Sequence, residues 1–137
     1  MNKKIFRLVS IALFIFSGLA AADPNVKEGL WEITAKMELP GMPMTMPAVT
    51  KTECLSKDKL IPKTGKVENC QECKISNVDI QGDTVKWHEE CYSPEGKVIA
   101  DGEIVYNGDS YSGVIKIKQG DMNIINKISG KYIGPCR

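Results

Sequence analysis

Four turn signals rich in glycine, aspartate and asparagine divide the second half of the chain. They follow one another at intervals of about ten to fifteen residues: Gln81-Gly82-Asp83, Ser93-Pro94-Glu95-Gly96, Asn107-Gly108-Asp109 and Gln119-Gly120-Asp121. Short turns of this kind join strands that are consecutive in the chain and antiparallel in the sheet. The spacing therefore predicts an antiparallel meander.

Strand signals extend over most of the rest of the chain. Leu30–Met37 alternates, so Trp31, Ile33 and Ala35 share one face. The seven expected strands cover 30–37, 50–55, 73–80, 84–91, 98–106, 111–118 and 122–128, with Gly130 and Gly134 loosening the tail. Ser56–Lys59 is the only expected helical turn. We expect an all-β fold of about seven strands, a curled sheet or a lipocalin-like partial barrel, because no helix would cover the apolar face of a flat sheet.

The first 22 residues resemble a secretory signal peptide. Lys3, Lys4 and Arg7 precede a short apolar run that ends at Phe16, and a run of small residues closes with Ala22. The apolar run is shorter than the roughly 18 to 20 residues of a membrane-spanning helix. We therefore expect cleavage after Ala22, a single domain over residues 23–137, and no permanent membrane anchor.

The charge balance of this domain argues against two classes of partner. The signal segment takes three of the 18 basic residues and none of the 17 acidic ones, which leaves a formal charge of −2. Nucleic acids and anionic membranes select clustered Lys and Arg. We therefore expect neither as a partner.

Five cysteines follow the signal segment, as is typical of an oxidising compartment. If the Gly82 hairpin has a three-residue loop, Cys73 lies opposite Cys91, where a disulfide is feasible. Cys54 and Cys136 then remain to pair, and Cys70 is left over. The alternatives are a redox motif at Cys70-Gln71-Glu72-Cys73, for which no helix follows to lower the thiol pKa, and a zinc site, for which the ligand set is incomplete.

A segment rich in methionine and proline carries thioethers at alternate positions, Met42, Met44 and Met46. Thioethers suit Cu(I), and His88 could complete such a site. The alternative is a structural loop whose methionines cover the core or the open end of the sheet.

The sequence offers no catalytic residues and calls for no cofactor. His88 is the only histidine and has no partner at a recognisable spacing, so neither a triad nor an acid–base pair is indicated. Trp31 and Trp87 are interpreted first as core anchors, because each can bury a large apolar area, and they are also candidates for the ligand-binding face.

Taken together, these features resemble a family of bacterial exported proteins catalogued as a domain of unknown function, DUF3617. The resemblance covers Gly29 to Cys136 and rests on Gly29-Leu30-Trp31-Glu32-Ile33, Leu39-Pro40-Gly41-Met42-Pro43, Thr52-Glu53-Cys54-Leu55, Cys73 with Cys91, Tyr106-Asn107-Gly108-Asp109-Ser110-Tyr111-Ser112-Gly113 and Ser129-Gly130-Lys131-Tyr132-Ile133-Gly134-Pro135-Cys136. It implies a Gram-negative periplasmic location, matches four cysteines other than Cys70, and supplies no activity or cofactor.

Three functions remain open from the sequence. The first is a non-enzymatic module that binds an apolar small molecule or a peptide on the concave face of the sheet, under the loop of Met42, Met44 and Met46. The second is a carrier of a soft metal through the same methionines. The third is an envelope enzyme whose site the sequence does not reveal.

Overall fold

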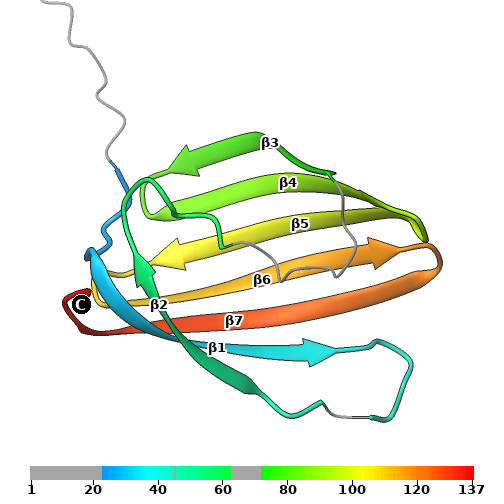
Figure 1. Cartoon of the computed structure of the whole chain (residues 1–137), viewed down its shortest axis with the longest axis horizontal. Coiled ribbons are helices and arrows are strands. Elements are labelled where there is room, and N and C mark those ends of the chain that lie inside the picture. The colour runs from blue at the N-terminus through cyan, green and yellow to red at the C-terminus, as the bar shows by residue number, and fades with distance from the viewer. Residues whose placement is uncertain (1–22, 45, 63–71) are drawn as a thin grey trace, which may run out of the picture.

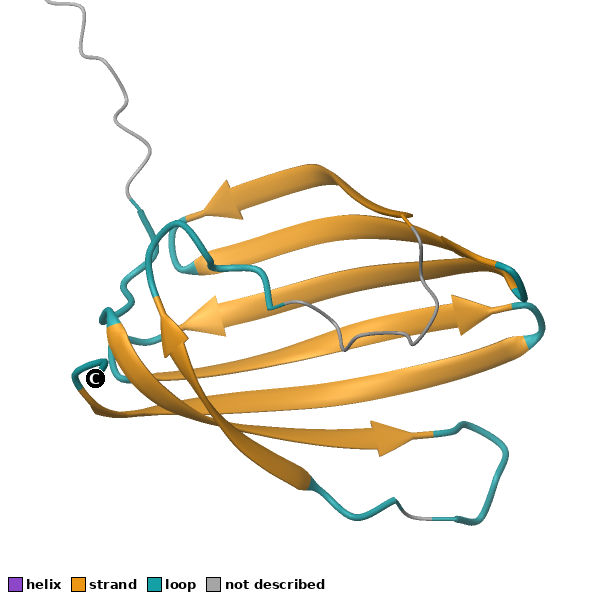
Figure 2. Ribbon diagram, viewed as in Figure 1, coloured by secondary structure: helices purple, strands orange, loops and turns teal. Residues whose placement is uncertain are grey.

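Seven antiparallel strands form one sheet in the computed structural model, which describes residues 23–44, 46–62 and 72–137 (Figures 1 and 2). The strands are β1 (Gly29–Glu38), β2 (Val49–Leu55), β3 (Glu72–Gln81), β4 (Thr84–Ser93), β5 (Gly96–Tyr106), β6 (Ser110–Gln119) and β7 (Met122–Gly134). The expected all-β meander is confirmed. None of the described residues forms a helix long and apolar enough to cross a bilayer.

The order of strands in the sheet is β2-β1-β7-β6-β5-β4-β3. The meander runs without a crossover from β3 to β7, and β1 then pairs with β7 on one side and β2 on the other. The sheet curls but does not close into a barrel, which leaves β2 and β3 as its two edges (Figure 1).

The β3–β4 hairpin differs from its expected geometry in two ways. Gln81 pairs with Thr84, so the turn contains two residues and not three. A β-bulge between Ser76 and Asp79 then shifts the register by one residue, and Asn77 within it has a φ of 50°. Because the bulge offsets the shorter turn, Cys73 lies opposite Cys91 as expected.

Side chains alternate between two faces of the sheet. We call the face that carries Trp31, Val85 and Ile104 the inner face, and the opposite one the outer face. The largest fully buried side chains all point to the inner face: Trp31, Tyr106, Ile104, Ile115 and Val85. Burying a large apolar side chain of this kind stabilises the fold by roughly 1.5–3 kcal/mol. The core therefore lies on the concave side of the curl.

Two glycines on the inner face allow aromatic rings to lie flat against the neighbouring strand. The indole of Trp87 lies over Gly102, where a Cβ would be 2.2 Å from Cζ2 of the ring. The ring of Tyr111 lies over Gly130 in the same way, with a Cβ position 2.0 Å from Cε1. Because neither position carries a Cβ, each ring can lie close against the neighbouring strand on the concave side of the sheet.

Two local expectations are wrong. Ser56–Lys59 forms a hydrogen-bonded turn and no helix, with Lys59 N donating to the carbonyl of Ser56 at 2.9 Å. The tail after Ile128 is not loosened, because β7 continues through Gly130 to Gly134. The expected signal peptide (residues 1–22) and Cys70 lie outside the described residues.

Candidate functional site

The candidate site is a groove on the inner face, about 530 Å³ in volume. It lies between the end of β2, the segment 56–62 that follows it, and the inner faces of β3 and β4. We call it the inner groove. Its apolar lining is Ile33, Leu55, Leu60, Ile61, Pro62, Ile75, Val78, Ile80 and Val85.

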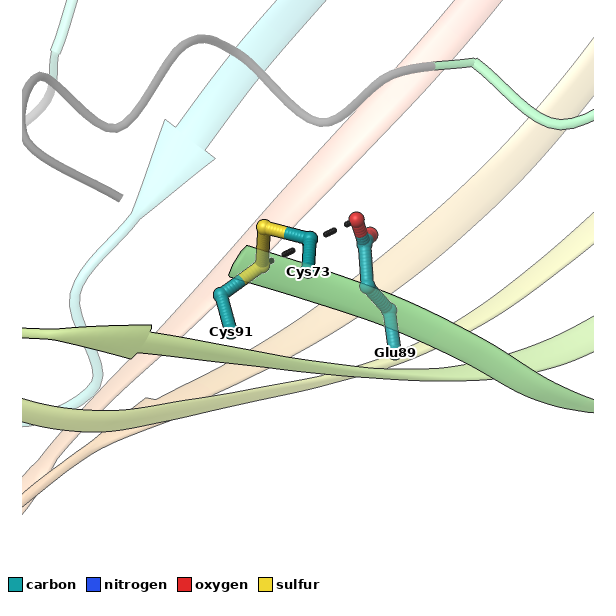
Figure 3. A group of neighbouring side chains, drawn as sticks. All are labelled: Cys73, Glu89 and Cys91. Carbon is teal, nitrogen blue, oxygen red and sulfur yellow. Dashed lines mark hydrogen bonds between the residues drawn. A yellow bond between two sulfur atoms is a disulfide. The ribbon is translucent and has the colours of Figure 1, made fainter. Parts of the chain in front are cut away.

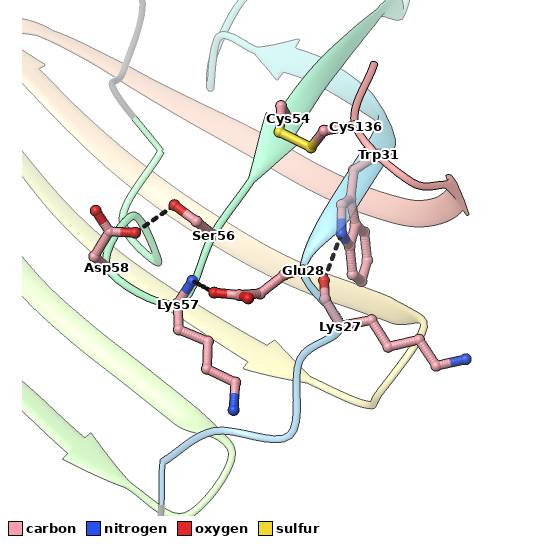
Figure 4. The surroundings of a disulfide bond; sticks show 8 residues. All are labelled: Lys27, Glu28, Trp31, Cys54, Ser56, Lys57, Asp58 and Cys136. Atoms are coloured by element: carbon pink, nitrogen blue, oxygen red, sulfur yellow. Dashed lines mark hydrogen bonds between the residues drawn. A yellow bond between two sulfur atoms is a disulfide. The ribbon is translucent and has the colours of Figure 1, made fainter.

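One wall of the inner groove is a segment without regular structure that several contacts hold in place. Ser56 Oγ donates to the carboxylate of Asp58, and Lys57 N donates to Glu28 Oε1 at 3.0 Å (Figure 4). Further along, the hydroxyl of Tyr106 donates to the carbonyl of Leu60. These contacts bring Leu60 and Ile61 against the core.

The second wall is β3, whose inner side chains are partly open to solvent. Ile75, Val78 and Ile80 are 44, 49 and 41 % exposed, although they point to the same face as the core. β3 is an edge strand, so only β4 pairs with it in the described part of the sheet. The groove is therefore apolar and accessible along this edge.

Charges of both signs surround the mouth of the inner groove. Lys57 and Lys59 lie there with Glu53 and Asp58. The hydrogen bond from the Ser56 hydroxyl lowers the pKa of Asp58, which keeps that carboxylate ionised. Glu53 pairs with Lys51 at 3.0 Å. The mouth is polar but selects no single sign of charge.

The end of the inner face beyond the groove is filled by aromatic side chains. The ring centroids of Trp31 and Tyr111 are 5.5 Å apart, and those of Tyr106 and Tyr111 are 5.4 Å apart. Burial raises the pKa of Tyr111 to about 12 and that of Tyr106 further. Trp31 Nε1 donates to the carbonyl of Lys27 at 2.9 Å, which seals this end with the N-terminal segment (Figure 4).

The two tryptophans predicted as ligand-face candidates both lie on the inner face, but both are buried. Trp31 is 0 % and Trp87 is 3 % exposed, so each packs as part of the core. Within the described structure, Trp87 Nε1 and Asn126 Oδ1 are buried atoms that have no hydrogen-bond partner. The lining of the groove comes instead from aliphatic residues for which the sequence predicted no individual role in binding.

Both expected cysteine pairs are bonded in the structure. The Cys54–Cys136 disulfide ties the end of β2 to the C-terminal tail (Figure 4), and the Cys73–Cys91 disulfide joins β3 to β4. Glu89 lies on the same face as Cys91, and its Oε1 is 3.8 Å from Cys91 Sγ (Figure 3). These disulfides are consistent with an exported protein.

The structure separates His88 from the three methionines with which it was grouped. Met42, Met44 and Met46 lie in the β1–β2 connection and are 58, 71 and 41 % exposed. They do not line the inner groove, so the expectation that their loop roofs the concave face is wrong. His88 lies on β4, and β7, β6 and β5 come between β4 and β1 in the sheet.

His88 is engaged by acidic residues on the outer face. Its Nδ1 lies 2.7 Å from Asp101 Oδ1, and its Nε2 lies 3.3 Å from Glu90 Oε1. The hydrogen bond to Asp101, and then that to Glu90, raises the pKa of His88. Glu90 also pairs with Lys97 at 2.8 Å. Copper binding by the methionines stays a prediction. His88 is not near them, because its ring is bound by Asp101 on β5 and Glu90 on β4.

Comparison with known protein families identifies the family of the chain. A family model described as "Protein of unknown function (DUF3617)" matches residues 26–136. The chain belongs to the DUF3617 family. No curated protein and no solved structure matches it.

The DUF3617 match includes everything that builds the inner groove. It begins at Val26, which bridges to Gly108 at the sealed end of the core, and it ends at Cys136, the partner of Cys54. The family's description names no activity.

Proposed function

We propose that this DUF3617 protein is a non-enzymatic binding module of the periplasm that holds an apolar small molecule in the inner groove. The observation that carries the proposal is the exposure of Ile75, Val78 and Ile80 on the inner face beside a groove of about 530 Å³. Ligand pockets for small molecules fall in the range of roughly 300–1,000 Å³ and have mainly apolar linings.

The energetics favour an apolar occupant. Covering the exposed faces of these three side chains would gain about 25 cal/mol for each Å² of apolar surface removed from water. The opposite wall is already ordered, because Leu60 and Ile61 pack against the core and the Leu60 carbonyl accepts the Tyr106 hydroxyl. A preformed wall reduces the entropy that binding would cost.

The mixed charges at the mouth support a ligand whose body is uncharged. Lys57 and Lys59 are balanced there by Glu53 and Asp58. We expect polar ends of the ligand to remain at this rim and its apolar part to lie along β3. A peptide in the groove is the alternative, and the mass of the bound species distinguishes the two.

The periplasmic location is proposed from three independent signs. They are the signal-like first 22 residues, the two disulfides, and the location that the family resemblance implies. Cell fractionation with an antibody to the protein tests it, and a cytoplasmic protein with four reduced cysteines in place of the disulfides would contradict it.

The binding proposal is tested on protein purified from the periplasm. Native mass spectrometry should show a small apolar species that co-purifies, or uptake of one from a lipid extract. The neutral probe N-phenyl-1-naphthylamine should gain fluorescence on addition of the protein. A protein that carries no extra mass, takes up nothing from the extract and leaves the probe unchanged would remove the proposal.

Exposure of the methionines favours a second candidate, a soft-metal carrier. Met42, Met44 and Met46 are all solvent-accessible in one connection, where their sulfurs can reach a Cu(I) ion without any movement of the core. Anaerobic titration with Cu(I) tests it. Within the described structure, no residues of an envelope enzyme are indicated.

A further inference from the structure

The β3–β4 disulfide brings three metal-ligating side chains together on the inner face. One ligand atom from each of Cys73, Cys91 and Glu89 lies within 4.8 Å of the others. Cys73 and Cys91 are paired across the two strands, and Glu89 precedes Cys91 by two residues, so all three point the same way (Figure 3). The backbone ladder on both strands fixes this arrangement.

The disulfide keeps these atoms from acting as a metal site. A sulfur bonded to another sulfur carries no thiolate charge, and the thiolate is the form that binds metals. A dithiol reductant changes this. It breaks the Sγ–Sγ bond, each sulfur gains one hydrogen, and the dithiol itself is oxidised to a disulfide.

We propose that reduction of the Cys73–Cys91 disulfide creates a Zn²⁺ site with Cys73, Cys91 and Glu89 as protein ligands. Zn²⁺ replaces the two thiol protons, which are released to solvent, and the ion is bound by two sulfurs and one carboxylate oxygen. Zinc accepts this ligand set in tetrahedral geometry, and three protein ligands leave a fourth position for water. Mg²⁺ and Ca²⁺ require oxygen ligands and would not be retained.

Two of the three proposed ligands are buried. Cys91 and Glu89 are 6 and 7 % exposed. Without metal, the reduced pair carries two neutral thiols, whereas bound Zn²⁺ takes the place of their protons and balances the charge of the two thiolates. Cys73 is exposed, so one sulfur of the disulfide is open to an attacking thiol. Oxidised and reduced protein should therefore differ sharply in metal affinity.

Cobalt provides the spectroscopic test. Protein from the periplasm with Cys70→Ser, which removes the fifth cysteine, is reduced with a phosphine and titrated with Co²⁺ without oxygen. We expect one Co²⁺ per chain, a thiolate-to-cobalt band in the near ultraviolet, the visible bands of tetrahedral cobalt, and loss of all of them on addition of Zn²⁺. The oxidised protein should show none of these bands.

Matched variants assign the ligands. Cys73→Ser with Cys91→Ser should abolish the bands, whereas Cys54→Ser with Cys136→Ser should retain them. Glu89→Gln should weaken Zn²⁺ binding by about tenfold or more, since even residues that only support a metal ligand contribute that much. Glu90→Gln is the control, because Glu90 lies next in the chain but faces His88 and Lys97 on the outer side.

A folding measurement covers the case in which reduction loosens the sheet. Zn²⁺ should raise the Tm of the reduced protein and leave that of the oxidised protein unchanged. The proposal is overturned if reduced protein gives no thiolate-to-cobalt band, if the bands survive the Cys73/Cys91 double substitution, or if Glu89→Gln binds Zn²⁺ as tightly as the parent. It is also overturned if the reduced chain lacks strand signal in circular dichroism even with Zn²⁺ present.

Discussion

The indole of Trp87 lies directly over Gly102, the residue opposite it on β5, so closely that a methyl group at position 102 would occupy the place of the ring. Gly102→Ala should therefore displace Trp87 and destabilise the protein by roughly 1–3 kcal/mol. Urea unfolding followed by tryptophan fluorescence measures the loss. Ser112→Ala, an exposed residue on the outer face of β6, is the control and should stay within about 0.5 kcal/mol of the parent.

The two disulfides should differ in what they contribute to stability. Cys54 and Cys136 are 82 residues apart in the sequence, and Cys73 and Cys91 are 18 apart. In the chain-entropy model, bridges of these spans stabilise by roughly 4.5 and 3 kcal/mol. Paired Cys→Ser variants compared in urea should therefore lose more stability when Cys54–Cys136 is removed. Equal losses of unfolding free energy in the two variants would show that the disulfides do not act mainly by restricting the unfolded chain.

A charge placed in the inner groove should abolish binding of an apolar probe. Val78 is 49 % exposed, so Val78→Asp should fold, but a bound apolar molecule would bury the new carboxylate. We expect the affinity for N-phenyl-1-naphthylamine to fall at least about tenfold. Val105→Asp introduces the same charge at a position of similar exposure on the outer face and should leave probe binding unchanged.

The pKa of His88, measured by NMR titration, tests its contacts on the outer face. Its pKa should lie above 6.5, chiefly because of the hydrogen bond to Asp101. Asp101→Asn should move it downward more than Glu90→Gln does, and Asp109→Asn should not move it. Because the folded state raises this pKa, the stabilising contribution of His88 is complete below about pH 6.5 and is lost as the pH rises through the folded-state pKa. A pKa unmoved by Asp101→Asn would contradict the geometry.

Copper binding, if the methionines provide it, should not depend on His88. Met42, Met44 and Met46 replaced together by Leu should remove any Cu(I) binding tighter than about micromolar. His88→Ala should have no effect, because three strands separate its strand from β1 and its ring is held by Asp101 and Glu90. Competition with a Cu(I) chelator measures both. Binding that survives the triple substitution would place the metal elsewhere.

Turn chemistry and strand alternation predicted the seven strands correctly, because each signal is local. The register of Cys73 opposite Cys91 was also predicted, although from a three-residue turn that does not exist. The real turn is one residue shorter, and the bulge at Asn77 compensates. A bulge has no strong sequence signal of its own, so this compensation was not visible beforehand.

The inner groove could not be found from the sequence. Ile75, Val78 and Ile80 are typical of any strand, and their exposure depends on β3 being an edge, which is a property of the whole sheet. The sequence predicts a cap and one helical turn over Ser56–Lys59, but the segment from Ser56 to Pro62 forms a wall of the groove. Its position over the core depends on distant partners, Glu28 and Tyr106, that local patterns do not reveal.

The pairing of β1 with β7 also constrains the order in which the sheet can form. The first strand of the domain pairs with the last, so the sheet cannot form completely until the whole domain has been synthesised. A chain delivered from its N-terminus through a narrow translocation channel would keep β1 without its C-terminal neighbour until the last residues emerged. Because β7 lies between β1 and β6, loss of the final strand would separate β1 and β2 from the rest of the sheet.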